Sequence, residues 1–223
     1  MTDQDRPTPT GEDYLKAVWR AQEWSDDPVT PSELAAALGA ARSTASETIR
    51  RLAAQGLLTH PSYGTVALTD EGRRRAVDVV RRHRLVEAFL VQALGYSWDE
   101  VHQDAEVIEH AVSDRFVERV DAALGHPARD PHGDPIPAPD GTVERPAATR
   151  LDQAPIGVPL RVVRVADDDP DLLRHLVELG LQLDATFSVV EHQAYAGLVL
   201  LDVDGATQRL GLSATRSIWV GTA

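Results

Sequence analysis

The sequence of 223 residues contains no cysteine and a single methionine, Met1. The absence of cysteine excludes disulfides, thiolate nucleophiles, iron–sulfur clusters and cysteine-rich structural zinc sites. Because Met1 is the only thioether, a metal site inside the protein must use oxygen and nitrogen ligands.

Long hydrophobic runs are also absent, since no apolar stretch approaches the roughly 20 residues that span a bilayer. The residues that follow Met1, Thr-Asp-Gln-Asp, have neither the basic nor the apolar region of a signal peptide. We therefore expect a soluble, cytoplasmic protein with no membrane partner. Hydrophobic residues make up 43% of the chain, which is enough for folded cores, and the length allows one large domain or two to three small ones.

Positive charge is scarce, and the formal net charge is −13. An even spread of this charge would argue against nucleic-acid binding. Residues 1–82, however, hold 11 basic and 12 acidic side chains, whereas residues 83–223 hold 11 and 23. The acidity thus belongs to the later part, and the nearly neutral N-terminal part stays compatible with DNA.

The N-terminal part has the pattern of a winged helix-turn-helix. Residues 10–24 predict an amphipathic helix, and the capping box Thr30–Glu33 predicts a second helix over 31–38. A further box, Thr44–Glu47, predicts the start of the next helix after a tight turn. Residues 57–69 then predict two strands of a wing around a Ser62-Tyr63-Gly64 turn.

The pattern changes twice beyond the wing. Helices are predicted over 69–94, over 98–112 behind a Ser97–Glu100 capping box, and over 113–124. Residues 126–150 contain six prolines and predict an irregular, extended linker. Alternating strands and one short helix follow, which is typical of a small, partly open β-barrel.

Imidazole and carboxylate side chains gather on the two predicted helices that follow the wing. His102, Glu106 and His110 are spaced by four residues, and His83 and Glu87 form a similar pair upstream. This spacing places such groups on one side of a helix, where they can bind a divalent cation. The alternative is a solvated helix face with charged neighbours.

Five segments in this order resemble the DtxR/MntR family of metal-dependent transcriptional repressors. They are residues 12–19, 33–58, 81–90, 101–114 and 130–137. The resemblance implies a mainly α protein with α+β parts. It implies a winged helix-turn-helix DNA-binding domain (1–74), a helical metal-binding and dimerisation domain (75–145) with the proline-rich linker from about 126, and an SH3-like, FeoA-like β-barrel (150–223).

The resemblance also implies the ligands of a primary metal site, which are Asp13, Glu106, Glu109 and His110. Iron-sensing members have Met and Cys at the positions of Asp13 and Glu106, whereas manganese-sensing members have Asp and Glu. Three carboxylates and one imidazole are hard ligands that suit Mn²⁺, which supports the same choice.

A second, ancillary site is implied at His83, Glu87 and His102, and two Mn²⁺ ions are expected per subunit. Asp130 and His132 match second-site ligands of some manganese sensors. An acidic group of the triplet Asp167-Asp168-Asp169 could complete this site, and Asp169 is the candidate chosen; a solvated loop and helix N-cap is the alternative.

The predicted recognition helix supplies the candidate DNA contacts, because its N-terminal turn can reach base edges in the major groove. These candidates are Arg42, Ser43, Thr44, Ser46, Glu47, Arg50 and Arg51.

The function that follows is a homodimeric, Mn²⁺-activated repressor, not an enzyme, that binds a palindromic operator in double-stranded DNA and controls metal-ion homeostasis genes. An Fe²⁺-responsive regulator of the same family is the first alternative. A metallohydrolase is a second alternative, although the sequence has no HExxH motif or phosphate-binding loop. A winged-helix regulator of an organic ligand is the third.

Overall fold

The computed structural model describes residues 7–25, 27–59 and 64–223, which form two compact units. The first unit comprises residues up to Arg82 together with Pro137–Thr142, and the second comprises His83–Ile136 and Val143–Ala223. Within these described ranges, no helix is long and apolar enough to cross a membrane. The three sequence domains and their boundaries stay a prediction.

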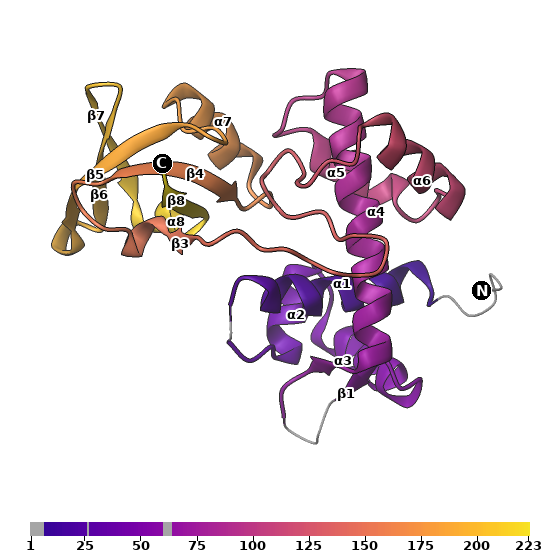
Figure 1. The fold of residues 1–223 in the computed structure, drawn as a ribbon. Coiled ribbons are helices and arrows are strands. Elements are labelled where there is room, and N and C mark those ends of the chain that lie inside the picture. The colour runs from indigo at the N-terminus through magenta and orange to yellow at the C-terminus, as the bar shows by residue number, and fades with distance from the viewer. Residues whose placement is uncertain (1–6, 26, 60–63) are drawn as a thin grey trace. The chain divides into compact units, whose positions relative to one another are not determined.

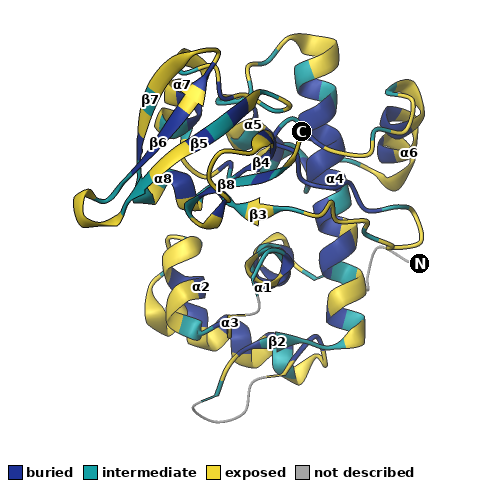
Figure 2. Ribbon diagram, turned by 60° about the vertical axis from the view of Figure 1, so that its left-hand side comes forward, coloured by how far each residue is buried: buried dark blue, intermediate teal, exposed yellow. Residues whose placement is uncertain are grey.

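The described part of the first unit contains three short helices and a two-stranded hairpin; Figure 1 labels the helices and the first strand, and Figure 2 labels the second. They are α1 (Pro9–Glu23), α2 (Pro31–Ala37), α3 (Arg42–Ala54), β1 (Leu58–Thr59) and β2 (Ala67–Leu68). Leu15, Leu34 and Ile49 are among the fully buried side chains that join the helices. The winged helix-turn-helix prediction is confirmed, although Ser62 and Tyr63 of the predicted wing turn lie outside the described residues.

One predicted helix start is confirmed and two are wrong. The side chain of Thr30 accepts from the Glu33 amide and the Glu33 carboxylate accepts from the Thr30 amide, which closes the predicted capping box of α2. The box Thr44–Glu47 does not cap α3, because that helix already begins at Arg42. The box Ser97–Glu100 does not cap α5 (Val101–Ile108), whose N-cap residue makes no side-chain bond.

Helix α4 (Asp70–Leu94) belongs to both units, since the boundary falls between Arg82 and His83. Gly72 makes its first turn possible: a Cβ atom there would lie 1.9 Å from the carbonyl oxygen of Leu57. Figure 2 shows the middle of α4 largely buried and its C-terminal end exposed. The predicted helix over 69–94 is therefore confirmed to within one residue.

The helical part of the second unit corrects two expectations. Helix α5 ends at Ile108 rather than at 112, so Glu109 and His110 lie in the turn before α6 (Asp114–Ala123). The segment 126–150 is irregular over most of its length, as predicted, but it is not simply an extended linker. Its residues 130–137 are nearly all buried, because the backbone and side chain of Asp130 close a turn with Asp134 and the turn packs against the following sheet.

The rest of the second unit is a six-stranded antiparallel sheet in the order β3-β8-β4-β5-β6-β7. The strands are β3 (Thr149–Arg150), β4 (Pro159–Val165), β5 (Thr186–Gln193), β6 (Leu198–Val203), β7 (Ala206–Gly211) and β8 (Ile218–Thr222). Helices α7 (Pro170–Glu178) and α8 (Leu212–Arg216) and the short 3₁₀ helices η2 (Leu151–Gln153) and η3 (Ala194–Ala196) interrupt them. Leu173, Leu176 and Leu201 lie in the shared core, which agrees with the fold class expected from the sequence.

Leu201 gives a direct test of this core, because its side chain is fully buried on β6. We expect Leu201→Ala to lower the free energy of unfolding by about 3 kcal/mol, through lost burial and the cavity left behind. Urea unfolding of the metal-free protein, followed by circular dichroism, measures this change. Val177→Ala on α7, where the side chain is 43% exposed, is the control and should change stability by less than about 0.5 kcal/mol. Equal losses for the two variants would contradict this assignment of the core.

Candidate metal centre

Four ligand-type side chains converge in the second unit from three different segments. His83 and Glu87 lie one turn apart on α4, His102 lies on α5, and Asp167 follows the end of β4. One atom of each lies within 4.8 Å of one atom of all the others. The Oε1 atom of Glu87 is 3.0 Å from the Nε2 atom of His83 and 3.1 Å from the Nδ1 atom of His102. The Nδ1 atom of His102 is also 3.1 Å from Oδ2 of Asp167.

His132 extends this cluster from the turn of residues 130–134. Its Nδ1 atom is 3.6 Å from Oε2 of Glu87, and its Nε2 atom is 2.6 Å from the carbonyl oxygen of Trp98. Asp130 is buried beside them and forms a further ligand-type group with Glu87 and His132. His132 and Asp130, both candidate ancillary ligands from the sequence, lie next to Glu87.

Two atoms of the cluster fit a cation. Oε2 of Glu87 and Nδ1 of His132 are buried and make no hydrogen bond within the part of the chain that the structure describes. A buried polar atom that makes no hydrogen bond is costly. The Glu87 oxygen, and the His132 nitrogen once that imidazole is neutral, can each donate a lone pair to a divalent cation. The donor set of imidazoles and carboxylates therefore fits a hard or intermediate metal ion.

Asp169, the acidic residue chosen from the triplet, lies elsewhere. Its side chain caps α7 by accepting from the amide of Leu172. Asp167, two residues earlier, is the member of the triplet that contacts His102, and only 3% of it is exposed. The sequence indicated the acidic triplet as a whole. Which of its three residues contacts His102 depends on how the chain folds after β4.

The three predicted primary ligands of the second unit lie close to His83. Glu109 is fully buried, and its Oε2 atom is 2.5 Å from Nδ1 of His83. Glu106 approaches the same nitrogen at 3.9 Å, and His110 lies 3.5 Å from the other oxygen of Glu109. Asp13, the fourth predicted ligand, lies on α1 in the first unit.

Burial and mutual charge shift the pKa values of this cluster. Burial alone would raise the pKa of Glu87, but the charge of His83 and the contacts with His102 and His132 hold that pKa well below its usual value. Burial opposes the charged form of His102, yet Asp167 and Glu87 raise its pKa to about 10. The same balance, with Glu87 as the main partner, raises the pKa of His132 to about 9. Burial, with Asp134 and Glu87 nearby, raises the pKa of Asp130 to about 7.

The DNA-binding candidates all lie on α3, where the structure exposes every one of them. They are Arg42, Ser43, Thr44, Ser46, Glu47, Arg50 and Arg51. The opposite face carries Ala45, Ile49 and Leu52, which are buried in the first unit. Since α3 follows α2 after a tight turn, its exposed face has the position of a recognition helix.

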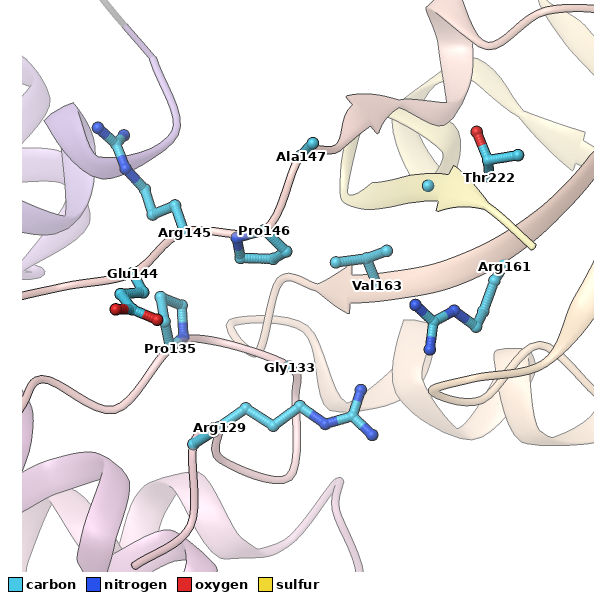
Figure 3. Close-up of a pocket in the computed structure, with 12 residues that line it drawn as sticks. Arg129, Gly133, Pro135, Glu144, Arg145, Pro146, Ala147, Arg161, Val163 and Thr222 are labelled. Carbon is cyan, nitrogen blue, oxygen red and sulfur yellow. The ribbon is translucent and has the colours of Figure 1, made fainter.

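The second unit also has an open cavity of 590 Å³ that contains none of the candidate ligands. Figure 3 shows Arg129 and Arg161 along one side of it, and both guanidinium groups bind Asp184. Gly133 and Val163 lie where the turn of residues 130–134 meets β4. The cavity therefore lies where that turn meets the sheet, and no candidate metal ligand lines it.

Three protein families match successive parts of the chain. Residues 8–66 match the N-terminal DNA-binding domain of the iron-dependent repressors, and residues 69–138 match their metal-binding and dimerisation domain. Residues 149–221 match the FeoA domain. The iron-dependent repressor IdeR of Mycobacterium leprae (strain TN) is 32% identical over 210 residues, which cover 88% of this chain and 89% of that protein. The diphtheria toxin repressor of Corynebacterium diphtheriae (strain ATCC 700971 / NCTC 13129 / Biotype gravis) is 29% identical over 201 residues, 85% of this chain and 88% of that one.

Solved structures of manganese regulators are similar over nearly the whole chain. A manganese-dependent transcriptional repressor in complex with manganese is 51% identical, with a TM-score of 0.91, and the match covers 96% of this chain and 100% of that one. The manganese regulator SloR is 30% identical, with a TM-score of 0.84 and a coverage of 97% and 100%.

These relatives are transcriptional repressors rather than enzymes, which removes the metallohydrolase alternative. The exposed face of α3 and the buried cluster of imidazoles and carboxylates are the two features that such a repressor needs. The chain therefore belongs to the DtxR family of iron-dependent repressors, which are metal-dependent, DNA-binding transcriptional repressors.

Proposed function

We propose that this protein is a cytoplasmic, homodimeric repressor that Mn²⁺ activates, with two cations per subunit, and that it binds a palindromic operator of metal-ion homeostasis genes. The observation that supports this proposal best is the donor set. Every candidate ligand is a carboxylate or an imidazole, and the chain has no cysteine. Hard oxygen ligands suit Mn²⁺, which has the lowest intrinsic affinity among the first-row divalent ions and depends on ligand type and availability.

Fe²⁺ is the second candidate, since the relatives named as iron-dependent repressors are 32% identical to this chain. The manganese-dependent repressor is more similar, at 51% identity. The carboxylates Asp13 and Glu106, at positions where iron-sensing members carry sulfur ligands, also favour Mn²⁺.

The ancillary cation would be held by His83, Glu87, His102 and His132, with Asp167 or Asp130 as a further carboxylate. Glu87 is the centre of this set, because its oxygens lie within 3.6 Å of all three histidines. A cation here would satisfy the buried Glu87 and His132 atoms that make no hydrogen bond among the described residues.

The primary cation would be held by Asp13, Glu106, Glu109 and His110. Asp13 lies in the first unit with the recognition helix, and the other three lie in the second unit. A cation bound by all four would restrict the movement of the DNA-reading unit. Two subunits held in this way would present two recognition helices to half-sites about one helical turn, roughly 34 Å, apart.

The helical part of the second unit has a surface suited to a second copy of the chain. Val107, Phe116 and Leu94 expose 73%, 39% and 60% of their surface, although they are large and apolar. Their segments lie in the stretch that matches the family's dimerisation domain. Large apolar residues that stay exposed in one subunit are typical of a surface that a second copy covers.

A titration of operator binding with Mn²⁺ tests the proposed function. Fluorescence anisotropy of a labelled operator should show affinity rising with Mn²⁺ and returning to its starting value with chelator. Parallel titrations under anaerobic conditions with Fe²⁺ test the second candidate. Equal operator affinity in chelator and in saturating Mn²⁺ would refute metal activation, and stronger activation by Fe²⁺ would replace Mn²⁺ in the proposal.

Binding of the ancillary cation should release protons. In the metal-free protein the pKa of His102 is about 10 and that of His132 about 9, so both imidazoles are charged at neutral pH. A cation binds only the neutral imidazole, so we expect at least about two protons to be released and the Mn²⁺ affinity to fall as the pH is lowered. Calorimetry in buffers of different ionisation enthalpy measures the release. His102→Ala should reduce it by about one proton, and a binding enthalpy that is the same in all buffers would contradict the expectation.

A further inference from the structure

We infer that Arg164 is a positioning residue of the ancillary site: through Asp134 it holds the turn of residues 130–134 against β4, so that His132 and Asp167 are presented together. The inference rests on the ancillary site of the proposed function. Arg164 itself is in none of the ligand groups, and it lies three residues before Asp167 on the same segment.

The ion pair between Arg164 and Asp134 is short and buried. The Nε atom of Arg164 donates to Oδ1 of Asp134 at 2.6 Å, and the two side chains are 8% and 2% exposed. Arg84 adds a second guanidinium: its Nη2 atom is 3.4 Å from the same oxygen, and its Nη1 atom donates to the carbonyl of Pro135 at 2.7 Å. Charge-assisted bonds between buried groups hold their segments in one geometry, because breaking them leaves a charge without a partner.

The turn that Asp134 closes has little freedom of its own. Oδ1 of Asp130 accepts from the amides of His132 and Asp134, both at 2.9 Å, and the Asp130 amide donates to the Asp134 carbonyl at 3.0 Å. His132 is therefore held between two bonded ends. A displacement of Asp134 would move His132 with it.

The same turn crosses β4 at a close approach. The amide of Val165 donates to the carbonyl of His132 at 2.9 Å. Gly133 has a φ of 92°, and a Cβ atom there would lie 2.1 Å from the carbonyl oxygen of Val163. Figure 3 shows the turn with Gly133 beside the strand that carries Val163. Glycine at position 133 therefore permits the close backbone contact with β4. The ion pair between Asp134 and Arg164 holds the same turn on β4 through side chains.

A β-bulge aims Arg164 into this position. The register of β4 against β8 shifts between Val162 and Arg164, and four successive residues of the strand, 162–165, are buried. A bulge re-aims the side chains that follow it. The guanidinium of Arg164 lies over the ring of Trp219, 4.2 Å from its centroid, which fixes the side chain from its other face.

The ion pairs therefore join three of the four segments that carry ancillary ligands. Arg84 adjoins His83 on α4, Asp134 lies two residues after His132, and Arg164 precedes Asp167. Loss of Arg164 should act on the cation through His132. An effect on cation affinity that depends on His132 distinguishes a positioning role of Arg164 from a general role in the stability of the protein.

The test measures Mn²⁺ binding to the full chain by calorimetry in wild type, Arg164→Gln, His132→Ala and the double variant. We expect Arg164→Gln to lower the Mn²⁺ affinity of the ancillary site, seen as one phase of the titration, about tenfold or more. This is the usual effect of losing a residue that orients a metal ligand. The phase that reports the primary site should not change. In the His132→Ala background the same change should weaken ancillary binding by a smaller factor than in wild type, since the ligand through which it chiefly acts is gone. Asp134→Asn, nearly identical in shape, is the second variant and should behave like Arg164→Gln.

Arg161→Gln is the matched control, because Arg161 lies on the same strand and pairs with Asp184 at the surface. It should bind both cations as wild type does. Three results would overturn the inference: unchanged ancillary affinity in Arg164→Gln and Asp134→Asn, equal weakening of both phases, or the same loss with and without His132. A single Mn²⁺ phase in wild type would instead remove the proposed ancillary site, and the inference with it, so the wild-type titration tells the two failures apart.

Discussion

Replacing Glu109 with glutamine is expected to reduce operator binding in saturating Mn²⁺ by about 100-fold, which corresponds to about 2.8 kcal/mol of lost coupling. Glu109 is fully buried, with one oxygen 2.5 Å from His83 and the other 3.5 Å from His110. It therefore faces both proposed sites. Glutamine keeps the shape of the side chain but removes the charge and one lone-pair donor, and added Mn²⁺ should not restore the variant.

Anisotropy titrations of a labelled operator measure this loss at several Mn²⁺ concentrations. Glu118→Gln, an exposed residue on α6, is the matched control and should bind as wild type. Circular dichroism of both variants without metal shows whether the fold is kept. Full operator affinity of folded Glu109→Gln at high Mn²⁺ would show that this carboxylate is not a ligand the repressor needs.

Exchanging the two distinguishing carboxylates should change which metal activates the repressor. In Asp13→Met with Glu106→Cys, sulfur replaces two hard oxygen ligands, which disfavours Mn²⁺ and favours Fe²⁺ and later ions. We expect the ratio of half-activating Mn²⁺ to half-activating Fe²⁺ concentrations to rise about tenfold or more. Operator binding under anaerobic conditions, with each metal titrated separately, gives this ratio.

Glu118→Cys introduces a thiol at an exposed position and controls for thiol chemistry alone. The two single variants show whether one exchange is sufficient. An unchanged ratio in the double variant would mean that metal preference is set by residues other than Asp13 and Glu106.

The parts of this structure that the sequence predicted well depend on local patterns. The capping box at Thr30 and Glu33 forms as expected, because all its atoms lie within four consecutive residues. His83 and Glu87 come together because residues four apart share one face of a helix. His102 could be assigned to the same cluster through the family resemblance, although it lies on another helix.

The parts that the sequence did not predict depend on contacts between distant residues. Asp167 meets His102 only because β4 ends beside α5, and neither spacing nor composition distinguishes it from Asp169. The prolines of residues 126–150 suggested an extended linker, yet Asp134 is buried there because Arg84 and Arg164, both on distant segments, neutralise it. The conformational propensities of residues 126–150 cannot indicate an ion-pair partner that lies on a distant segment.

The start of α3 shows a conflict between two local signals. Thr44 and Glu47 have the residue types of a capping box, but the chain has already entered the helix at Arg42. Ala41 is extended and serves as the N-cap without a side-chain bond. The preceding turn, closed by the bond from the Ala40 amide to the Ala35 carbonyl, fixes where the helix begins.

The second unit is built from two separate stretches of the chain, and this has a consequence for synthesis on the ribosome. Residues 83–136 and 143–223 form one compact body, so the helical stretch emerges before the residues that complete it. Synthesis adds about 5–20 residues per second, so Arg164 is made some seconds after Asp134, with which it pairs. The last strands of the core against which Trp98 packs are made later still. A nascent chain released near residue 145 would therefore expose a buried carboxylate and an indole ring together. Shortening the gene at the proline-rich segment should yield a product that aggregates or is degraded, rather than a smaller working repressor.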